Sequence, residues 1–323
     1  MLILIISFII TAGCTTPKIR LYPSQADPLH EFTLQGTEKG KVAVIPVRGL
    51  ISDEPKQQFF RTMPSMVQEF ISQVNLAEKD KEVKAILIKV DSPGGTVNAS
   101  DILYREISAF KERTQKKIVV AMMSVAASGG YYISLPADHI LAHPTTVTGS
   151  IGVIFYRPKL TGLMGKIGVD VEVSKSGKNK DMGSPFRQTS KEEENILQNL
   201  TDQLAARFSD LVVSHRKLDR MTLAEVLTGR VYLAPEAREL GLVDEVGYLD
   251  DAVSKAKELA GLPQEAKVVV YRRTEYPDDN LYNTSTTRFE GSRFSLISLD
   301  ILDSMPGLQT GFYYLWAPAV NLK

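Results

Sequence analysis

The sequence predicts an α/β body in which short strands alternate with longer helices. Three runs rich in β-branched and apolar residues, at 42–47, 85–90 and 118–123, are separated by longer amphipathic stretches. Strands that alternate with helices favour a sheet covered by helices. Of the 323 residues 43% are hydrophobic, which is enough to build the core of such a body. No internal repeat divides the chain.

The first half of the body follows from this alternation. Runs of apolar residues indicate strands, and stretches with helical periodicity indicate helices. The expected elements, in chain order, are a strand at 42–47, a helix near 64–80, a strand at 85–90, a helix around 99–113, a strand at 118–123, a helix opening near Ser128, and strands near 139–142 and 169–174.

The second half is mainly helical. Ser190 and Glu193 have the spacing of a capping box and predict the start of a long helix. We expect its apolar face to pack on the sheet or on a partner subunit; the face comprises Ile196, Leu197, Leu200, Leu204, Phe208, Leu211 and Val212. Pro235 and Gly241 bracket a short helix, another helix begins near Asp250, and a strand at 268–273 closes the body.

The N-terminus predicts export. The apolar run from Met1 to Ala12 is shorter than the roughly 20 residues that span a bilayer, but it suits a signal peptide. Small residues before Cys14 are typical of a lipoprotein signal, in which the cysteine is lipidated and becomes the new N-terminus. We therefore expect a signal peptide at 1–13 and lipidation of Cys14, with an uncleaved anchor or an ordinary cleaved signal as alternatives. Residues 14–40 are polar and rich in Pro and Gly, which predicts a tether.

The C-terminal tail, residues 274–323, differs from the body. It is polar at first and then ends in an aromatic stretch at 312–316. One interpretation is a segment that packs on the body or on a neighbouring subunit. The other is an anchor at a membrane interface, which Trp and Tyr favour.

Charge and cysteine content exclude several functions. Lys plus Arg and Asp plus Glu both total 38, so the formal net charge is zero. The chain therefore has no overall positive potential that would favour the binding of nucleic acid. Cys14 is the only cysteine, which excludes a disulfide framework, a cysteine-rich metal site and a catalytic cysteine within the body.

Two glycine-rich turns carry the candidate chemistry. Ser128 lies in the stretch 124–132, where small residues allow a sharp turn and helix N–H groups favour negative charge. The stretch 91–95 also joins a strand to a helix, and the N–H of Gly95, or of Gly94, could bind an oxyanion. Each turn alone is better explained as an ordinary packing turn. Together they suggest a nucleophile and an oxyanion hole.

A lysine is the expected base. None of the four histidines, His30, His139, His143 and His215, lies in a motif that indicates catalysis. The stretch 173–185 is rich in lysine, and burial can lower a lysine pKa enough for it to act as a base. The alternative for each lysine there is a solvated loop charge.

The chain resembles signal peptide peptidase A. The motifs, in family order, are DSPGG at 91–95, SVAASGGYYIS at 124–134, TVTGSIGVI at 146–154, KSGKNKD at 175–181, SPFRQTSKEEE at 184–194 and GRVYLAPEARELGLVDEVG at 229–247. The resemblance implies a ClpP/crotonase-like α/β fold of β-β-α units, in a single peptidase domain at 41–273 with a helical extension. It also implies cleavage of leftover signal peptides and other short or unfolded segments, with neither a cofactor nor a metal.

The same resemblance assigns roles to individual residues. Ser128 is the expected nucleophile, Lys180 the general base, and Ser150 the residue that orients this lysine. Gly95 and Gly129 would supply the oxyanion hole, and Lys175 is the alternative base. A single-copy member is expected to form a ring-like homo-oligomer in which neighbouring subunits share each site.

The expected partners are therefore peptides, further copies of the chain and a membrane, at the exported side of a bacterial cell envelope.

Three alternatives to this function remain. A Ser/His/Asp peptidase would need a histidine where Val153 stands. A crotonase-type acyl-CoA enzyme would share the fold and the oxyanion hole, and a non-catalytic scaffold at the membrane would share the fold alone.

Overall fold

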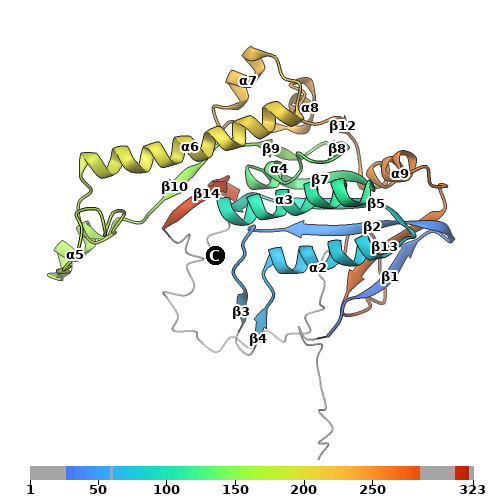
Figure 1. Ribbon diagram of the computed structural model, residues 1–323, viewed down its shortest axis with the longest axis horizontal. Coiled ribbons are helices and arrows are strands. Elements are labelled where there is room, and N and C mark those ends of the chain that lie inside the picture. The colour runs from blue at the N-terminus through green and yellow to red at the C-terminus, as the bar shows by residue number, and fades with distance from the viewer. Residues whose placement is uncertain (1–26, 59–60, 284–309, 320–323) are drawn as a thin grey trace, which may run out of the picture.

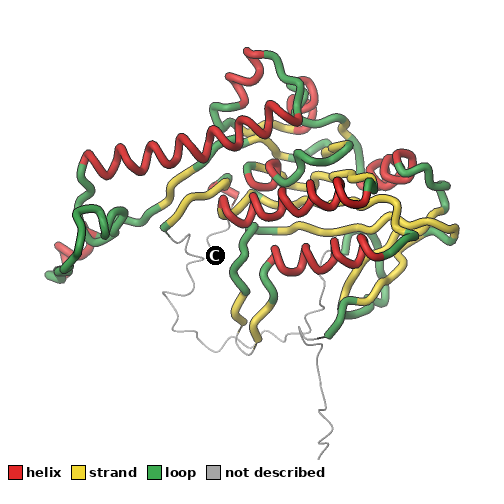
Figure 2. Tube along the Cα trace, viewed as in Figure 1, coloured by secondary structure: helices red, strands yellow, loops and turns green. Residues whose placement is uncertain are grey.

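The chain folds around a mixed sheet with helices on both faces (Figures 1 and 2). The computed structural model describes residues 27–58, 61–283 and 310–319. Neighbouring strands of the main sheet are parallel, apart from two antiparallel pairs, β1 with β13 and β9 with β11. In spatial order this sheet contains β1 (His30–Gln35), β13 (Ala266–Arg272), β2 (Glu38–Arg48), β5 (Val83–Ser92), β7 (Lys117–Ala127), β8 (His139–Ala142) and β12 (Glu245–Val246), with β9 (Val147–Gly149) joining β7 to β11 (Val231–Leu233).

Two smaller sheets lie beside the main sheet. One has three antiparallel strands in the order β10 (Ile154–Tyr156), β14 (Gly311–Leu315) and β6 (Gly94–Thr96). The other pairs β3 (Lys56–Gln58) with β4 (Arg61–Met63). The three-stranded sheet thus joins the last described strand of the chain to two strands of the body.

The helices lie on both faces of the sheet and along one edge of the molecule. In chain order they are α2 (Met66–Lys79), α3 (Val97–Thr114), α4 (Gly129–Tyr132), α5 (Thr161–Ile167), α6 (Lys191–His215), α7 (Arg220–Val226), α8 (Ala234–Glu239) and α9 (Leu249–Leu259), with a 3₁₀ turn at Ala317–Ala319. Figure 1 shows α2 and α3 along one side of the sheet and α6 extending beyond the body.

The central strand β5 explains the two-sided core. Ile86 and Ile88 contribute to the core cluster that includes α2 and α3, whereas Ala85 and Leu87 contribute to the cluster that includes α9. All four are fully buried. A parallel strand covered on both faces has this nearly continuous apolar sequence.

The sequence predicted most helix boundaries correctly. The capping box of Ser190 and Glu193 is confirmed, and a second box, made by Ser65 and Gln68, begins α2. The apolar face of α6 packs only in part. Phe208 and Val212 are fully buried, but Leu200 is 38% exposed, because the first half of the helix extends away from the sheet (Figure 1).

Two expectations about extended segments were wrong. The tether predicted for 14–40 ends earlier, because residues 30–35 form β1 and residues 38–40 begin β2. The strand predicted near 169–174 is absent; those residues are exposed and have no regular secondary structure. Valine alternation alone does not form a strand without a neighbouring strand to pair with.

The aromatic tail packs on the body of its own chain. Residues 311–315 form β14, in which Tyr314 is fully buried. Within the described residues, no helix combines the length and the apolar content needed to cross a membrane.

Candidate active site

Ser128 lies in a strained turn between β7 and α4. Its backbone has φ +52° and ψ −113°, a conformation that costs a non-glycine residue about 1–3 kcal/mol. Hydrogen bonds hold the turn on both sides. The Ser128 N–H donates to the Gly149 carbonyl at 2.8 Å, and the Tyr132 N–H donates to the Ser128 carbonyl at 2.8 Å. A strained serine between a strand and a helix is typical of a nucleophile elbow.

The Ser128 hydroxyl is buried without a partner. The residue is 1% exposed, and its Oγ has no hydrogen-bond partner among the described residues. Most buried polar atoms in folded proteins are hydrogen-bonded, so such a hydroxyl marks a candidate functional site.

Ser150 lies at the adjacent strand end. Strand β9 runs parallel to β7, and its last residue, Gly149, pairs with Ala127. Ser150 directly follows Gly149, and Ser128 directly follows Ala127. Ser150 also has a positive φ, +51°, and its N–H donates to the Arg230 carbonyl at 2.8 Å. The structure therefore brings the expected nucleophile and the expected orienting serine to the same edge of the sheet.

The turn at Gly94 packs directly against the start of α4. Gly94 has φ +102°, and a Cβ atom built on it would lie 2.7 Å from the Gly129 nitrogen. The same Cβ would lie 2.0 Å from the Tyr314 carbonyl oxygen. Only glycine allows this close approach in this backbone conformation. The two glycine-rich turns of the sequence are thus in contact, with the carbonyl of Tyr314 beside them.

The backbone groups of Gly95 face β14. The Gly94 carbonyl accepts from the Ile51 N–H at 2.9 Å, and the Thr96 N–H donates to the Ile51 carbonyl at 3.0 Å. Because these groups alternate along a strand, those of Gly95 point to the opposite side. There Tyr314 is the residue paired with Gly95.

Replacing Gly94 with alanine should weaken both the fold and the tail contact. The new methyl group would meet the backbone of Tyr314 at a left-handed φ, so we expect the free energy of unfolding to fall by about 2–4 kcal/mol. Urea denaturation would measure the change. Gly165→Ala is the control, because nothing lies within 4 Å of its Cβ position and its φ is not positive. Equal stability of Gly94→Ala and the wild type would contradict the close approach.

The expected lysines do not reach Ser128 within one chain. Lys175 Nζ forms an ion pair with Asp181 at 2.7 Å, and Lys180 is exposed in a turn. Both lie in the irregular segment between α5 and α6. Arg187 holds that segment to the start of α6 by ion pairs with Asp181 and Glu193, which lower the pKa of both carboxyl groups.

The length of α6 explains the separation. Phe208, in the second half of the helix, packs against Tyr132, with 4.9 Å between the ring centroids. The axis from Phe208 back to Lys191 is about 25 Å long at 1.5 Å per residue. The lysine segment precedes Lys191 and lies with α5 at the far end of the helix (Figure 1). The assignment of Lys180 or Lys175 as base stays a prediction.

A buried lysine elsewhere was missed by the sequence analysis. Lys89 in β5 is 3% exposed, and burial lowers its pKa to about 8. Its Nζ donates to the Leu281 carbonyl, so it has a structural partner distinct from Ser128. A lysine inside the apolar run at 85–90 was the signal in the sequence.

Three of the four histidines are engaged away from Ser128. His139 Nε2 lies 3.0 Å from a carboxylate oxygen of Glu245, His143 pairs with Thr145, and His215 pairs with the hydroxyl of Tyr104. In the described part of the chain, no group of three or more His, Cys, Asp or Glu side chains could hold a metal ion.

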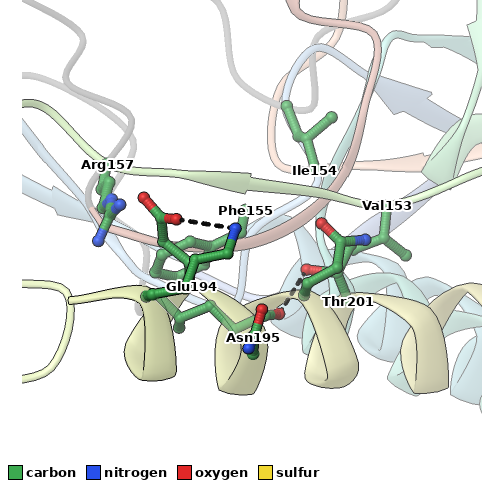
Figure 3. Close-up of a pocket in the computed structure, with 10 residues that line it drawn as sticks. Val153, Ile154, Phe155, Arg157, Glu194, Asn195 and Thr201 are labelled. Carbon is green, nitrogen blue, oxygen red and sulfur yellow. Dashed lines mark hydrogen bonds and ion pairs between the residues drawn. The ribbon is translucent and has the colours of Figure 1, made fainter. Parts of the chain in front are cut away.

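A groove of about 640 Å³ lies between β10 and the exposed half of α6 (Figure 3). None of the predicted site residues lines it. Its walls are Val153, Ile154, Phe155 and Arg157 on the strand side and Lys191, Glu194, Asn195, Leu197, Gln198 and Thr201 on the helix side. Phe155 also contacts Phe312 of β14, at 4.7 Å between ring centroids. The groove therefore adjoins the three-stranded sheet.

Two sequence profiles and several known proteins are similar to this chain. A sequence profile of Peptidase family S49 matches residues 110–263, and a profile of Clp protease matches residues 61–146. The putative signal peptide peptidase SppA of Enterococcus faecium is 36% identical over 248 residues, which cover 76% of this chain and 72% of that protein. The α/β class of ClpP-like type, expected from the motifs, is confirmed.

Two further relatives differ in length. A putative protease of Synechocystis is 36% identical over 222 residues, covering 69% of this chain and 75% of its own. Protease 4 of Salmonella typhi is 37% identical over 227 residues, covering 70% of this chain but 35% of its own. This chain therefore matches about a third of that longer protein.

Proposed function

Because the chain belongs to peptidase family S49 and is a serine peptidase, we propose that it degrades cleaved signal peptides and other short hydrophobic peptides at a membrane. Ser128 is the proposed nucleophile and Lys180 the proposed base. The name of the Enterococcus faecium relative, a putative signal peptide peptidase, supports this substrate class. The observation that carries the proposal is the strained turn of Ser128, with its buried and unpartnered hydroxyl.

Backbone amides are the proposed oxyanion hole. The N–H groups of Gly95 and Gly129 belong to turns that pack against each other, and Gly95 is paired with Tyr314 of β14. Fixed N–H donors stabilise the negative charge that develops on the carbonyl oxygen during acyl transfer. Removing one such donor typically costs about 10²–10³ in kcat.

The base is proposed to come from a neighbouring subunit. A lysine acts as a base when it is held neutral in a dry site, whereas the side chain of Lys180 is exposed in the single chain. Docking of the arm formed by residues 154–190 against a second copy would bury this amine beside Ser128. Ser150, at the same strand end as Ser128, would then orient it.

Exposed apolar side chains on this arm support the assembly. Large hydrophobic residues between 36% and 63% exposed gather there: Ile154, Tyr156, Leu160, Leu163, Ile167, Val169, Val171, Val173 and Phe186. Monomeric proteins rarely leave apolar residues clustered in solvent. A homo-oligomer that covers the arm would also provide a partner for the segment predicted as a strand at 169–174.

Peptide hydrolysis tests the function directly. We expect the assembled wild-type enzyme to cleave internally quenched hydrophobic peptides, and the variants Ser128→Ala and Lys180→Ala to lose this activity while keeping the oligomer. A wild-type enzyme that assembles but cleaves none of the peptides would refute the proposal.

Membrane attachment is proposed to depend on Cys14, which lies outside the described residues. Lipidation of this cysteine would hold the peptidase at the exported side of the cell envelope. A single acyl chain binds a membrane only marginally, so attachment needs two signals, such as the diacylglycerol and amide-linked chains of a bacterial lipoprotein.

Cys14→Ser should therefore shift the protein from the detergent phase to the aqueous phase in Triton X-114 partitioning. Ser24→Ala, in the same polar segment, is the control and should leave partitioning unchanged. If Cys14→Ser remains with the detergent, the N-terminal run is an anchor by itself.

A further inference from the structure

Ser92 is a buried serine without a role in the proposed mechanism. It is the last residue of β5 and lies directly before the turn that carries the proposed oxyanion donor Gly95. Its side chain is fully buried. A buried hydroxyl destabilises a fold unless it is hydrogen-bonded. Ser92 meets this requirement by bonding to the backbone of two neighbouring segments.

The Ser92 hydroxyl is both an acceptor and a donor. Its oxygen accepts from the Gly94 N–H at 3.1 Å. Its proton belongs to the bond with the Gly49 carbonyl, which lies 2.7 Å from Oγ, whereas the Gly94 carbonyl lies 3.4 Å away. The Gly49 N–H in turn donates to the Asp91 carbonyl at 2.9 Å. The hydroxyl thus joins the glycine turn to the chain that follows β2.

The bond to Ser92 decides which amide of the turn can act on a substrate. The Gly94 N–H is occupied by the Ser92 oxygen and therefore points into the protein. The Gly94 carbonyl and the Thr96 N–H both bond to Ile51, so the backbone groups of Gly95 point to the opposite side. The sequence left Gly94 and Gly95 open as oxyanion donors, and the occupied amide of Gly94 leaves Gly95.

Ser92 also touches the turn of the nucleophile. A Cβ atom built on Gly130 would lie 2.6 Å from the Ser92 carbonyl oxygen and 3.6 Å from the Ser92 Cβ atom. Gly130 is the second residue of α4, two positions after Ser128. Only glycine leaves room for this contact. Ser92 therefore lies between the oxyanion turn and the start of α4, and a shift of its backbone would disturb both.

We propose that Ser92 is a positioning residue for the oxyanion hole. Its hydroxyl holds the Gly94 N–H and thereby fixes the direction of the Gly95 N–H relative to Ser128. This inference rests on the proposed function, because it concerns the negative charge that develops when Ser128 attacks a peptide carbonyl. Fixed donors stabilise that charge only while they are aimed at it. The Ser92 hydroxyl should therefore stabilise the transition state more than it stabilises the bound peptide.

Ser92→Ala removes the hydroxyl and releases the Gly94 amide. We expect kcat for an internally quenched hydrophobic peptide to fall about 10–100-fold, because a displaced donor stabilises the transition state less well. KM should stay within about 2-fold of the wild-type value, because the peptide itself is still bound.

Ser65→Ala is the matched control. Ser65 is also fully buried, and its oxygen accepts from the Gln68 N–H at 3.1 Å at the start of α2. It is not one of the proposed site residues. This variant loses a comparable buried hydrogen bond, and we expect it to retain the wild-type kcat and KM.

A pair of inhibitors separates positioning from a general loss of structure. The aldehyde acetyl-Leu-Leu-leucinal forms a hemiacetal with Ser128: the serine oxygen bonds to the aldehyde carbon, and the hydroxyl proton passes through the base to the former carbonyl oxygen. The alcohol acetyl-Leu-Leu-leucinol has the same side chains but cannot form this bond. We expect Ser92→Ala to weaken inhibition by the aldehyde about 10-fold and to change inhibition by the alcohol less than about 2-fold.

A second variant keeps the test decisive if Ser92→Ala does not assemble. Ser92→Cys places a thiol in the same position, and a thiol is a weaker donor and acceptor than a hydroxyl. It should lower kcat and weaken aldehyde inhibition in the same direction, by at least about 3-fold, with the inhibition by the alcohol unchanged.

The outcomes separate this inference from the proposed function. Unchanged kcat and unchanged aldehyde inhibition in the assembled Ser92 variant, with active wild-type enzyme, would overturn the positioning role and leave the peptidase intact. Equal weakening of the aldehyde and the alcohol would also overturn it, because Ser92 would then support peptide binding as a whole. A wild-type enzyme that assembles but cleaves no peptide would overturn the proposed function, and this inference with it.

Discussion

Replacing Ser128 with alanine is expected to reduce peptide hydrolysis at least about 10³-fold, because removal of a catalytic serine leaves only binding and oxyanion stabilisation. The substitution removes one oxygen that has no hydrogen-bond partner among the described residues, so the fold should lose little stability. Alanine also retains the backbone bonds of the turn to Gly149 and Tyr132. Initial rates on an internally quenched hydrophobic peptide, with the oligomer monitored by light scattering, measure the effect.

Ser108→Ala is the matched control for this experiment. Its hydroxyl donates to the Tyr104 carbonyl within α3, and Ser108 is not one of the proposed site residues. We expect this variant to retain the wild-type rate. Full activity in Ser128→Ala, with assembly intact, would exclude this serine as the nucleophile and would reopen the acyl-CoA and scaffold alternatives.

Replacing Lys180 with alanine is expected to cause a loss of similar size, at least about 10³-fold, because without its base the Ser128 hydroxyl is a weak nucleophile. Lys175→Ala is the discriminating variant. It removes the ion pair with Asp181, which Arg187 also contacts. Activity retained in Lys175→Ala and lost in Lys180→Ala would assign the base to Lys180, and the reverse pattern would assign it to Lys175.

Mixing the two inactive variants tests whether neighbouring subunits share each site. In an assembly of equal amounts of Ser128→Ala and Lys180→Ala, roughly one quarter of the sites would receive an intact serine and an intact lysine from different chains, as a repeated heterologous interface allows. We expect activity to return to about that fraction of the wild-type rate.

The mixed sample must be shown to contain both chains, by capture of one tagged variant and detection of the other. Continued inactivity of a mixture that has co-assembled would mean that serine and lysine come from the same chain. That result would require the arm carrying the lysine to fold back along α6, a conformation different from the one described.

Much of the body could be predicted because its signals are local. The start of α6 followed from the spacing of Ser190 and Glu193, since a capping box involves residues three positions apart. The strand at 85–90 followed from an apolar run that is buried on both faces. The turn at Ser128 followed from the small residues around it, although its positive φ was visible only in the structure.

The failures concern segments whose structure depends on a distant partner. Residues 30–35 alternate exposed polar residues with the half-buried Phe32 and Leu34, and they form β1 because β13 offers an edge to pair with. Residues 169–174 have strand-like alternation but no neighbouring strand. The aromatic stretch was recognised, but its pairing with Gly94–Thr96 was not, because no periodicity indicates which edge a strand will join.

The sequence by itself determined the α/β class, most helices and strands of the body, and the two glycine-rich turns with Ser128 between strand and helix. Tertiary structure decided that these turns touch, that the Tyr314 carbonyl lies beside them, and that the lysine segment is held far from Ser128 by α6. The physical reason is that backbone propensity and side-chain periodicity act over a few residues, whereas a catalytic site is assembled by strand pairing and packing between segments remote in the chain.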